Sequence, residues 1–294
     1  MIPERQTYSR RDVLKLAGYT GAIILSESLS GPVDFTESKY ATQLYVSPDN
    51  APGLEKHLPS THFIGHGPDN LPNVAITIDD FFGTSSIDYL QQVLVLGRSH
   101  GVHFTFFPVG KAQIENYRAM PRRTRSAWRQ ALSDGHSIGN HTYDHSLLGT
   151  MSTKAVDQEL IGQFNAMNSV LGFKHHEYLM RPPGGSGGFD NPTLHDQYVH
   201  TLNAVKDVGY YMTMWTVDSN APNGQIVTPN EDQRFLNKIF NDPYEHVRDG
   251  SIILVHPTTL SINGVNLLID GLRKRGYRML SVPELFTPPK KVVM

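Results

Sequence analysis

Apolar residues recur along residues 71–288 at spacings that alternate between strand-like and helical. The clearest helix is expected over 153–171, where apolar side chains three or four positions apart share one face: Val156, Leu160, Phe164, Met167 and Leu171. Further helices are expected over 86–98, 122–133 and 267–275. Strands are expected over 74–78, 103–107, 136–139, 178–180, 211–217, 251–256 and 277–280. This alternation predicts a single α/β domain with mostly parallel strands that close into a barrel.

The first 30 residues follow the order of an export signal. Arg10 and Arg11 precede a weakly apolar run over 16–25, and small residues follow around 28–31. This order resembles a twin-arginine signal with Val13 at the consensus phenylalanine; the alternative is an amphipathic N-terminal helix with a chance arginine pair. The apolar run is shorter than the ~20 residues that span a bilayer. We therefore expect recognition by the export machinery, no membrane anchor after signal removal, and a periplasmic, cell-wall or extracellular location.

Residues 31–70 carry glycine, proline, serine, asparagine and histidine without a sustained period, and are interpreted as an irregular lead-in or linker. The domain itself is expected over 71–288.

Composition narrows the chemistry that this domain could perform. The 294 residues include no cysteine, which excludes a disulfide framework, a zinc finger, an iron–sulfur cluster and a thiolate nucleophile. Any metal must therefore be bound by nitrogen and oxygen, and 14 histidines are available. The net charge of −2 carries no electrostatic signature of a nucleic-acid partner. Motifs for a phosphate loop and a dinucleotide site are missing from the sequence.

Chemically reactive side chains follow several of the predicted strands. Functional groups gather at the carboxyl ends of parallel strands, and five of these ends carry such residues: Asp79 and Asp80, His141 and His145, Arg181, Asp218, and His256. Each group taken alone has a structural explanation, such as a turn or a helix cap. Their placement at successive strand ends predicts that they meet in one site.

The same residues resemble the motifs of the polysaccharide deacetylases of the NodB homology class, carbohydrate esterase family 4. The resemblance covers residues 71–288 and runs through five ordered segments: 77–80 (Thr-Ile-Asp-Asp), 105–110, 135–145, 181–185 (Arg-Pro-Pro-Gly-Gly) and 254–256 (Leu-Val-His). It implies a single distorted (β/α) barrel of the NodB type.

The resemblance also implies roles for individual residues. Asp80, His141 and His145 would bind a divalent metal, for which zinc is the family expectation, while a His₂Asp set also accepts cobalt, nickel or manganese. Asp79 would be the general base and Arg181 would hold its orientation, while His256 would be the general acid.

Further residues would complete the catalytic and substrate-binding set. The resemblance implies that the backbone N–H of Gly184 stabilises the oxyanion and that Leu254 lines the pocket for the acetyl methyl. Asp218 is the retained first aspartate of the fourth motif and is counted with the catalytic group. Trp215, three residues earlier, is a candidate lining residue of the substrate pocket.

Three departures from the family pattern concern the substrate side of the site. Gly184 stands where a tyrosine is common, the fourth motif keeps only Asp218, and residues 81–83 read Phe-Phe-Gly where Gly-Pro or Gly-Tyr is common. The catalytic set is thus intact and the substrate-lining set is altered.

The expected function is removal of N-acetyl groups from an amino-sugar polymer such as chitin, chito-oligosaccharide or peptidoglycan. Alternatives are O-deacetylation of acetylated xylan or another glycan, a same-fold amidohydrolase with a non-carbohydrate substrate, and an inactive glycan-binding module.

Overall fold

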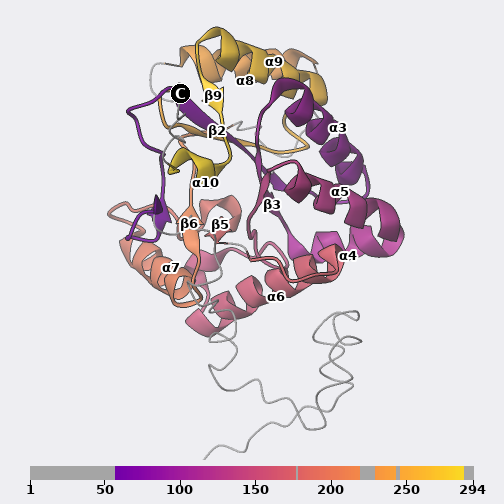
Figure 1. The fold of residues 1–294 in the computed structure, drawn as a ribbon. Coiled ribbons are helices and arrows are strands. Elements are labelled where there is room, and N and C mark those ends of the chain that lie inside the picture. The colour runs from indigo at the N-terminus through magenta and orange to yellow at the C-terminus, as the bar shows by residue number, and fades with distance from the viewer. Residues whose placement is uncertain (1–56, 177, 219–228, 243–245, 288–294) are drawn as a thin grey trace, which may run out of the picture.

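The computed structural model describes residues 57–176, 178–218, 229–242 and 246–287 (Figure 1). The predicted export signal over 1–30 lies outside the described residues, as does the first part of the predicted lead-in.

Nine described strands form two sheets in which every strand pair is parallel. The larger has the order β4-β3-β2-β8-β7, with β9 also paired to β2: β2 (Asn73–Asp80), β3 (Thr105–Pro108), β4 (Ser137–Ile138), β7 (Val217–Asp218), β8 (Ile252–Val255) and β9 (Arg278–Met279). The smaller has the order β1-β6-β5: β1 (Phe63–Ile64), β6 (Tyr211–Thr213) and β5 (Leu179–Met180).

The two sheets follow one another around a distorted barrel. A parallel bridge between Asn140 and Met180 joins the residues just after β4 to β5. On the other side, β6 in the smaller sheet leads within a few residues to β7 in the larger. The predicted single α/β domain with mostly parallel strands is therefore confirmed.

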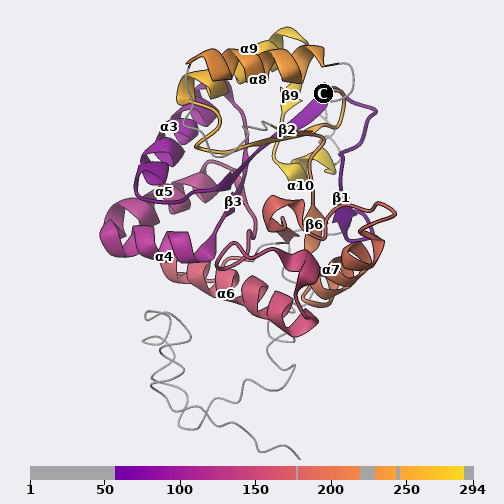
Figure 2. The ribbon, with the colours of Figure 1, turned by 180° about the vertical axis from the view of Figure 1, so that it is seen from behind.

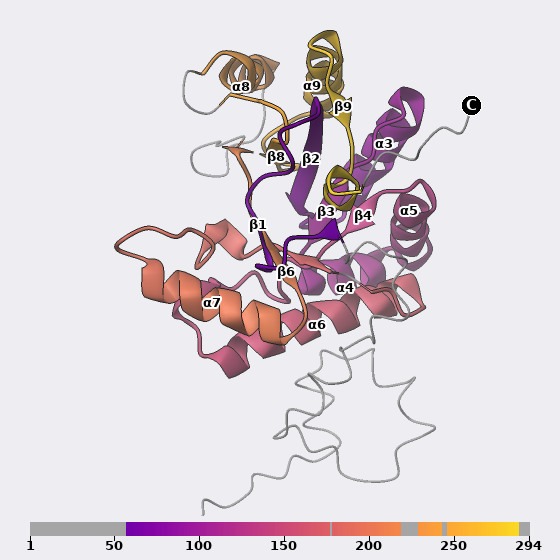
Figure 3. The same ribbon diagram turned by 60° about the vertical axis from the view of Figure 1, so that its left-hand side comes forward.

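Helices surround the strands (Figures 1 and 2). They are α3 (Ser85–His100), α4 (Gly110–Ala119), α5 (Pro121–Ser133), α6 (Thr153–Leu171), α7 (His195–Asp207), α8 (Pro229–Asn241), α9 (Ile262–Lys274) and α10 (Val282–Leu285), with short 3₁₀ turns at η3 (Leu148–Thr150) and η4 (Pro183–Gly185). Figure 3 shows α3 and α9 beside β2, and α6 and α7 beside β6. No helix among the described residues is sufficiently long and apolar to cross a membrane.

Helix α6 has the bounds that the sequence predicts. The Ser152 side chain accepts a hydrogen bond from the Ala155 N–H at its start, and Gly172 ends it in the left-handed conformation, with φ of 75°. Its apolar face is buried, with Val156, Leu160, Met167 and Leu171 inaccessible to solvent.

Other elements differ from the sequence predictions. The expected strand over 211–217 is divided into β6 and β7, which belong to different sheets. β1 lies in the stretch interpreted as an irregular lead-in, because Phe63 and Ile64 pair with Met212 and Thr213. Helices α4, α7, α8 and α10 were not expected. In α4 the reason is that polar Gln113 and Asn116 are buried, so no apolar stripe marks its inner face.

Candidate active site

The first part of the site is the end of β2, which carries both adjacent aspartates. Asp79 is 2% exposed, whereas the side chain of Asp80 is 21% exposed. Successive side chains of an extended strand point to opposite faces. Asp80, however, has φ of 79°, which lies in the left-handed region. This turn of the backbone lets both carboxylates approach His141, whose Nε2 lies 3.8 Å from Asp79 Oδ2 and 3.3 Å from Asp80 Oδ1.

The two histidines of the second motif complete a compact group with Asp80. His145 Nε2 lies 3.2 Å from the same Asp80 Oδ1 that His141 approaches. The three ligand atoms all lie within 4.8 Å of one another. His141 Nδ1 lies 2.7 Å from the carbonyl oxygen of Arg181 and donates its hydrogen there, which leaves the Nε2 lone pair of the neutral ring facing Asp80.

The donor set fits a divalent cation. Asp80 Oδ1 is buried and has no hydrogen-bond donor among the described residues, although two imidazoles face it. Burial alone would raise the pKa of Asp80, but the neighbouring His141 and His145 hold it well below its ordinary value. The carboxylate is therefore ionised, and with two imidazoles it forms a nitrogen–oxygen ligand set with positions left open for water and substrate.

The two adjacent carboxylates also shift the pKa of His141. Burial lowers this pKa, but the carboxylates of Asp79 and Asp80 outweigh burial, so that it lies above its ordinary value. A cation at this site would compete with protonation of His141, because an imidazole binds a metal in its neutral form.

Arg181 holds the Asp79 carboxylate in place. Its guanidinium is fully buried and donates to Asp79 Oδ1 at 2.8 Å and to Thr77 Oγ1 at 2.7 Å. It also donates to the carbonyl oxygens of Thr213 and Met214, at 3.0 and 3.1 Å. With Asp79 Oδ1 held in this way, Oδ2 is the oxygen left facing His141.

β7 and β8 bring the remaining predicted catalytic residues to the same edge of the barrel. Leu254 in β8 pairs with Thr77 on one side and Asp218 on the other, and His256 follows at the end of β8. His256 is among the groups whose charge lowers the pKa of Asp80. Burial lowers the pKa of Arg181, and the charges of Asp79 and Asp218 act in the opposite direction. The ring Nδ1 of His256 is buried without a hydrogen-bond partner among the described residues.

The loop after Arg181 holds Gly184, the predicted oxyanion residue, and the segment between β6 and β7 holds Trp215. Gly184 has φ of 58°, and a Cβ built there would lie 3.4 Å from Leu147 Cδ2. Trp215 packs edge-to-face on Phe189 with ring centroids 5.3 Å apart, and its ring lies 5.6 Å from the Arg181 guanidinium. The oxyanion role of Gly184 stays a prediction.

Sequence reasoning missed two kinds of residue. The motif gives Thr77 no role of its own, yet its hydroxyl accepts a hydrogen bond from Arg181 and donates one to the Ile253 carbonyl. Phe82, Leu147 and Phe189 are large, apolar and 51%, 59% and 41% exposed around the site. The unusual Phe-Phe-Gly sequence after Asp80 was the available signal for Phe82.

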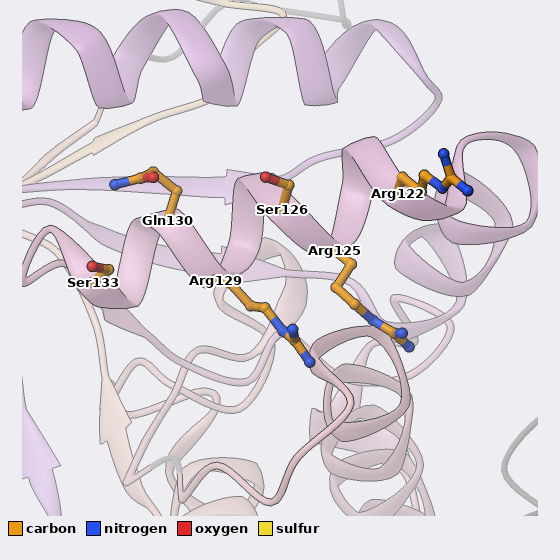
Figure 4. Close-up of a pocket in the computed structure, with 6 residues that line it drawn as sticks. All are labelled: Arg122, Arg125, Ser126, Arg129, Gln130 and Ser133. Carbon is orange, nitrogen blue, oxygen red and sulfur yellow. The ribbon is translucent and has the colours of Figure 1, made fainter.

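A separate groove lies along α5, on residues unconnected with the predicted site. It is lined by Arg122, Arg125, Ser126, Arg129, Gln130 and Ser133 (Figure 4). Two of these arginines are already used: Arg125 donates to the carbonyls of Ser169 and Val170, and Arg129 donates to that of Leu171. They therefore satisfy the carbonyl groups at the end of α6.

Fold and site together define an α/β-barrel with an Asp–His–His group and a buried aspartate–arginine pair at the carboxyl ends of its strands. The family model for polysaccharide deacetylase matches residues 66–213. The chain therefore belongs to the polysaccharide deacetylase family, as the motifs predicted.

Individual proteins and a solved structure are similar to this chain. The chain is 26% identical over 237 residues to a peptidoglycan-N-acetylglucosamine deacetylase of Bacillus cereus, an alignment that covers 79% of this chain and 97% of that protein. It is 29% identical over 233 residues to the uncharacterized protein YlxY of Bacillus subtilis, covering 79% of this chain and 62% of the relative. A crystal structure of a family 4 carbohydrate esterase pseudoenzyme from Bacillus anthracis has the same fold, with a TM-score of 0.62 at 22% identity over 78% of this chain and 70% of that chain.

Proposed function

We propose that the protein is a metal-dependent hydrolase that removes N-acetyl groups from an amino-sugar polymer. The observation that carries this proposal is the convergence of Asp80, His141 and His145 beside an aspartate, Asp79, whose second oxygen is left free by Arg181. Two relatives that are similar in sequence and named peptidoglycan-N-acetylglucosamine deacetylases support the choice of substrate class.

Asp80, His141 and His145 would hold the cation, and zinc is the proposed metal, with cobalt, nickel or manganese as ions that the same ligands accept. When bound, such a cation supplies an acidified water and polarises the acetyl carbonyl.

The protein's own groups then move the protons. Asp79 takes a proton from the attacking water at Oδ2, because Oδ1 is occupied by the Arg181 guanidinium. Arg181 keeps the carboxylate oriented, and Asp218 adds a further negative charge that acts on the guanidinium. His256 donates a proton to the departing amine, and the Gly184 N–H donates to the oxyanion. Leu254 and Trp215 line the space for the acetyl group.

The rim of the site supports a sugar substrate. Phe82 packs edge-to-face on His145 at 5.4 Å, Leu147 lies beside Gly184, and Phe189 packs on Trp215. Aromatic and aliphatic surfaces of this kind suit the C–H faces of a pyranose ring. Phe82 lies in the altered segment 81–83 and Leu147 lies beside the altered position Gly184. We propose that these residues and Phe189 replace the groove residues that this chain lacks.

The proposed setting is the cell envelope or its exterior. The twin-arginine sequence at Arg10 and Arg11 would direct export, and the peptidoglycan-acting relatives act on a substrate of the envelope.

The decisive experiment measures acetate released from a panel of acetylated substrates: chito-oligosaccharide, peptidoglycan and acetylated xylan, with zinc supplied. We expect release from an N-acetylated amino-sugar substrate, loss of release with a chelator, and loss in Asp79→Asn, which leaves the Asp–His–His ligands in place. Release only from xylan would assign the O-deacetylase alternative. No acetate from any substrate, with the metal bound, would refute the proposal.

A second candidate, an inactive glycan-binding module, is favoured by one observation: a pseudoenzyme of family 4 shares this fold. The fold alone thus does not establish catalysis. Retention of Asp79, Asp80 and both metal-site histidines favours the enzyme. Binding of the same glycans without acetate release, by protein loaded with zinc, would identify the binding module instead.

A further inference from the structure

The backbone that presents Asp80 is held in an unfavourable conformation. Asp80 and Phe81 are consecutive non-glycine residues with φ of 79° and 61°. Side chains with a Cβ, and bulky ones above all, are disfavoured in the left-handed region. Such strain persists only where surrounding contacts determine it, and here it lies directly at the metal-site aspartate.

Buried polar side chains converge on one atom of this segment, the carbonyl oxygen of Phe81. Gln113 and Asn116 of α4 donate to it through their amide nitrogens at 3.0 and 3.2 Å. The Ser86 hydroxyl of α3 lies 2.8 Å from it and 2.7 Å from the carbonyl oxygen of Gly83. All three side chains are buried. We refer to Gln113, Asn116 and Ser86 as the carbonyl clamp.

The orientation of Gln113 is itself determined. The indole N–H of Trp128 in α5 is a donor only, and it lies 3.0 Å from Gln113 Oε1. The other end of the amide, Nε2, must therefore be the end that donates to Phe81. The Trp128 ring also packs edge-to-face on the Phe81 ring, with centroids 5.2 Å apart.

The carbonyl of Asp80 is held as well, by the backbone N–H of Val109 at 3.1 Å. Both peptide groups that follow the left-handed residues thus have fixed partners in or next to α4. The burial of polar Gln113 and Asn116 in this helix, which concealed α4 in the sequence pattern, has a physical explanation in this arrangement.

We infer that Gln113 and Asn116, assisted by Ser86, are positioning residues for the metal site. By holding the Phe81 carbonyl they keep Asp80 in the left-handed conformation that turns its carboxylate toward His141 and His145. The inference rests on the metal site of the proposed function, although it concerns metal affinity rather than the identity of the substrate.

The test uses full-length Gln113→Met and Asn116→Leu, which keep the side-chain size and remove the donors. The matched control is Thr105→Val, which removes a buried hydrogen bond, from Val282 N–H at 2.8 Å, at the start of β3 and away from the clamp. Zinc dissociation constants are measured by chelator competition, and the visible spectrum of the cobalt-loaded protein reports the ligand geometry.

We expect zinc to bind about 10- to 100-fold more weakly in both clamp variants, as is usual when groups that orient metal ligands are removed. The cobalt spectrum should change in intensity, and lost activity should return toward that of the parent at saturating zinc. Thr105→Val should keep the parental zinc affinity and cobalt spectrum.

Folded Gln113→Met and Asn116→Leu proteins with parental zinc affinity and cobalt spectrum would overturn the inference. If neither variant folds, Ser86→Ala decides, because it removes a hydroxyl that contacts the carbonyls of both Phe81 and Gly83 without leaving a large cavity; an unchanged zinc affinity there would overturn the inference equally. A parent that binds zinc but releases no acetate would refute the proposed function while leaving the clamp to be judged on affinity. A parent that binds no divalent metal would overturn both.

Discussion

Replacement of Arg181 by methionine is the sharpest test of the buried part of the site. The guanidinium is inaccessible to solvent and donates to four acceptors, one of which is the carboxylate of Asp79. Methionine has a similar length and no donor. The substitution therefore leaves Asp79, itself 2% exposed, as a buried charge without its partner.

The expected loss of stability follows from this geometry. Removing one member of a buried, hydrogen-bonded ion pair costs about 3–5 kcal/mol, because the remaining charge stays desolvated. The acceptors on Thr77, Thr213 and Met214 also lose their donor, but losses within one network do not add, so we keep the estimate at about 3–5 kcal/mol. Arg181→Lys retains the charge with fewer donors in a different geometry, and should lose about half as much.

The measurement is the free energy of unfolding in urea, in the presence of a chelator so that metal binding does not contribute. The order of stability should be parent, then Arg181→Lys, then Arg181→Met. Acetate release should fall by at least about 100-fold in Arg181→Met when the protein is folded, because Asp79 is no longer held in position. A methionine variant within about 1 kcal/mol of the parent would refute the claim that this pair is buried and mutually dependent.

Three other predictions concern pH, metal binding and the rim. Burial lowers the pKa of His136 to about 4, so the folded state binds fewer protons there than the unfolded state. The free energy of unfolding should therefore fall by about 2 kcal/mol from pH 7 to pH 5 because of this histidine. His136→Asn should make the free energy of unfolding less dependent on pH in this range, and an equally steep dependence would contradict the role given to His136. Zinc should raise the melting temperature of the parent but not of Asp80→Ala, and equal shifts would argue against the proposed ligand set. Phe82→Ala should raise KM for the acetylated glycan several-fold, whereas Val95→Ala, equally exposed on α3, should leave it unchanged; equal KM values would remove Phe82 from the proposed substrate surface.

Features that depend on residues close together in the chain could be predicted from the sequence. α6 was predicted with its bounds because its apolar face, serine cap and terminal glycine are all local. Asp79 and Asp80 were placed at a strand end because an apolar run precedes them, and the HxxxH pair was recognised by its spacing. The order of these motifs was sufficient to indicate the family.

Features that depend on partners far apart in the chain could not be predicted from the sequence. Tyr211–Thr213 and Val217–Asp218 have similar strand character, and only their pairing with β1 and β8 decides that they belong to different sheets. α4 has no apolar stripe because two of its buried positions, Gln113 and Asn116, donate hydrogen bonds to the Phe81 carbonyl just after β2.

The sequence by itself determined the class of fold, the family and the ligand types. The tertiary structure decided how those ligands meet: Thr77 and Asp79 bind Arg181, which lies up to 104 positions further along the chain, and His141 receives its tautomer from a carbonyl 40 residues away. It also decided the left-handed turn at Asp80. A local pattern records which side chains are available, whereas direction, burial and charge at the site arise from segments that only the folded barrel brings together.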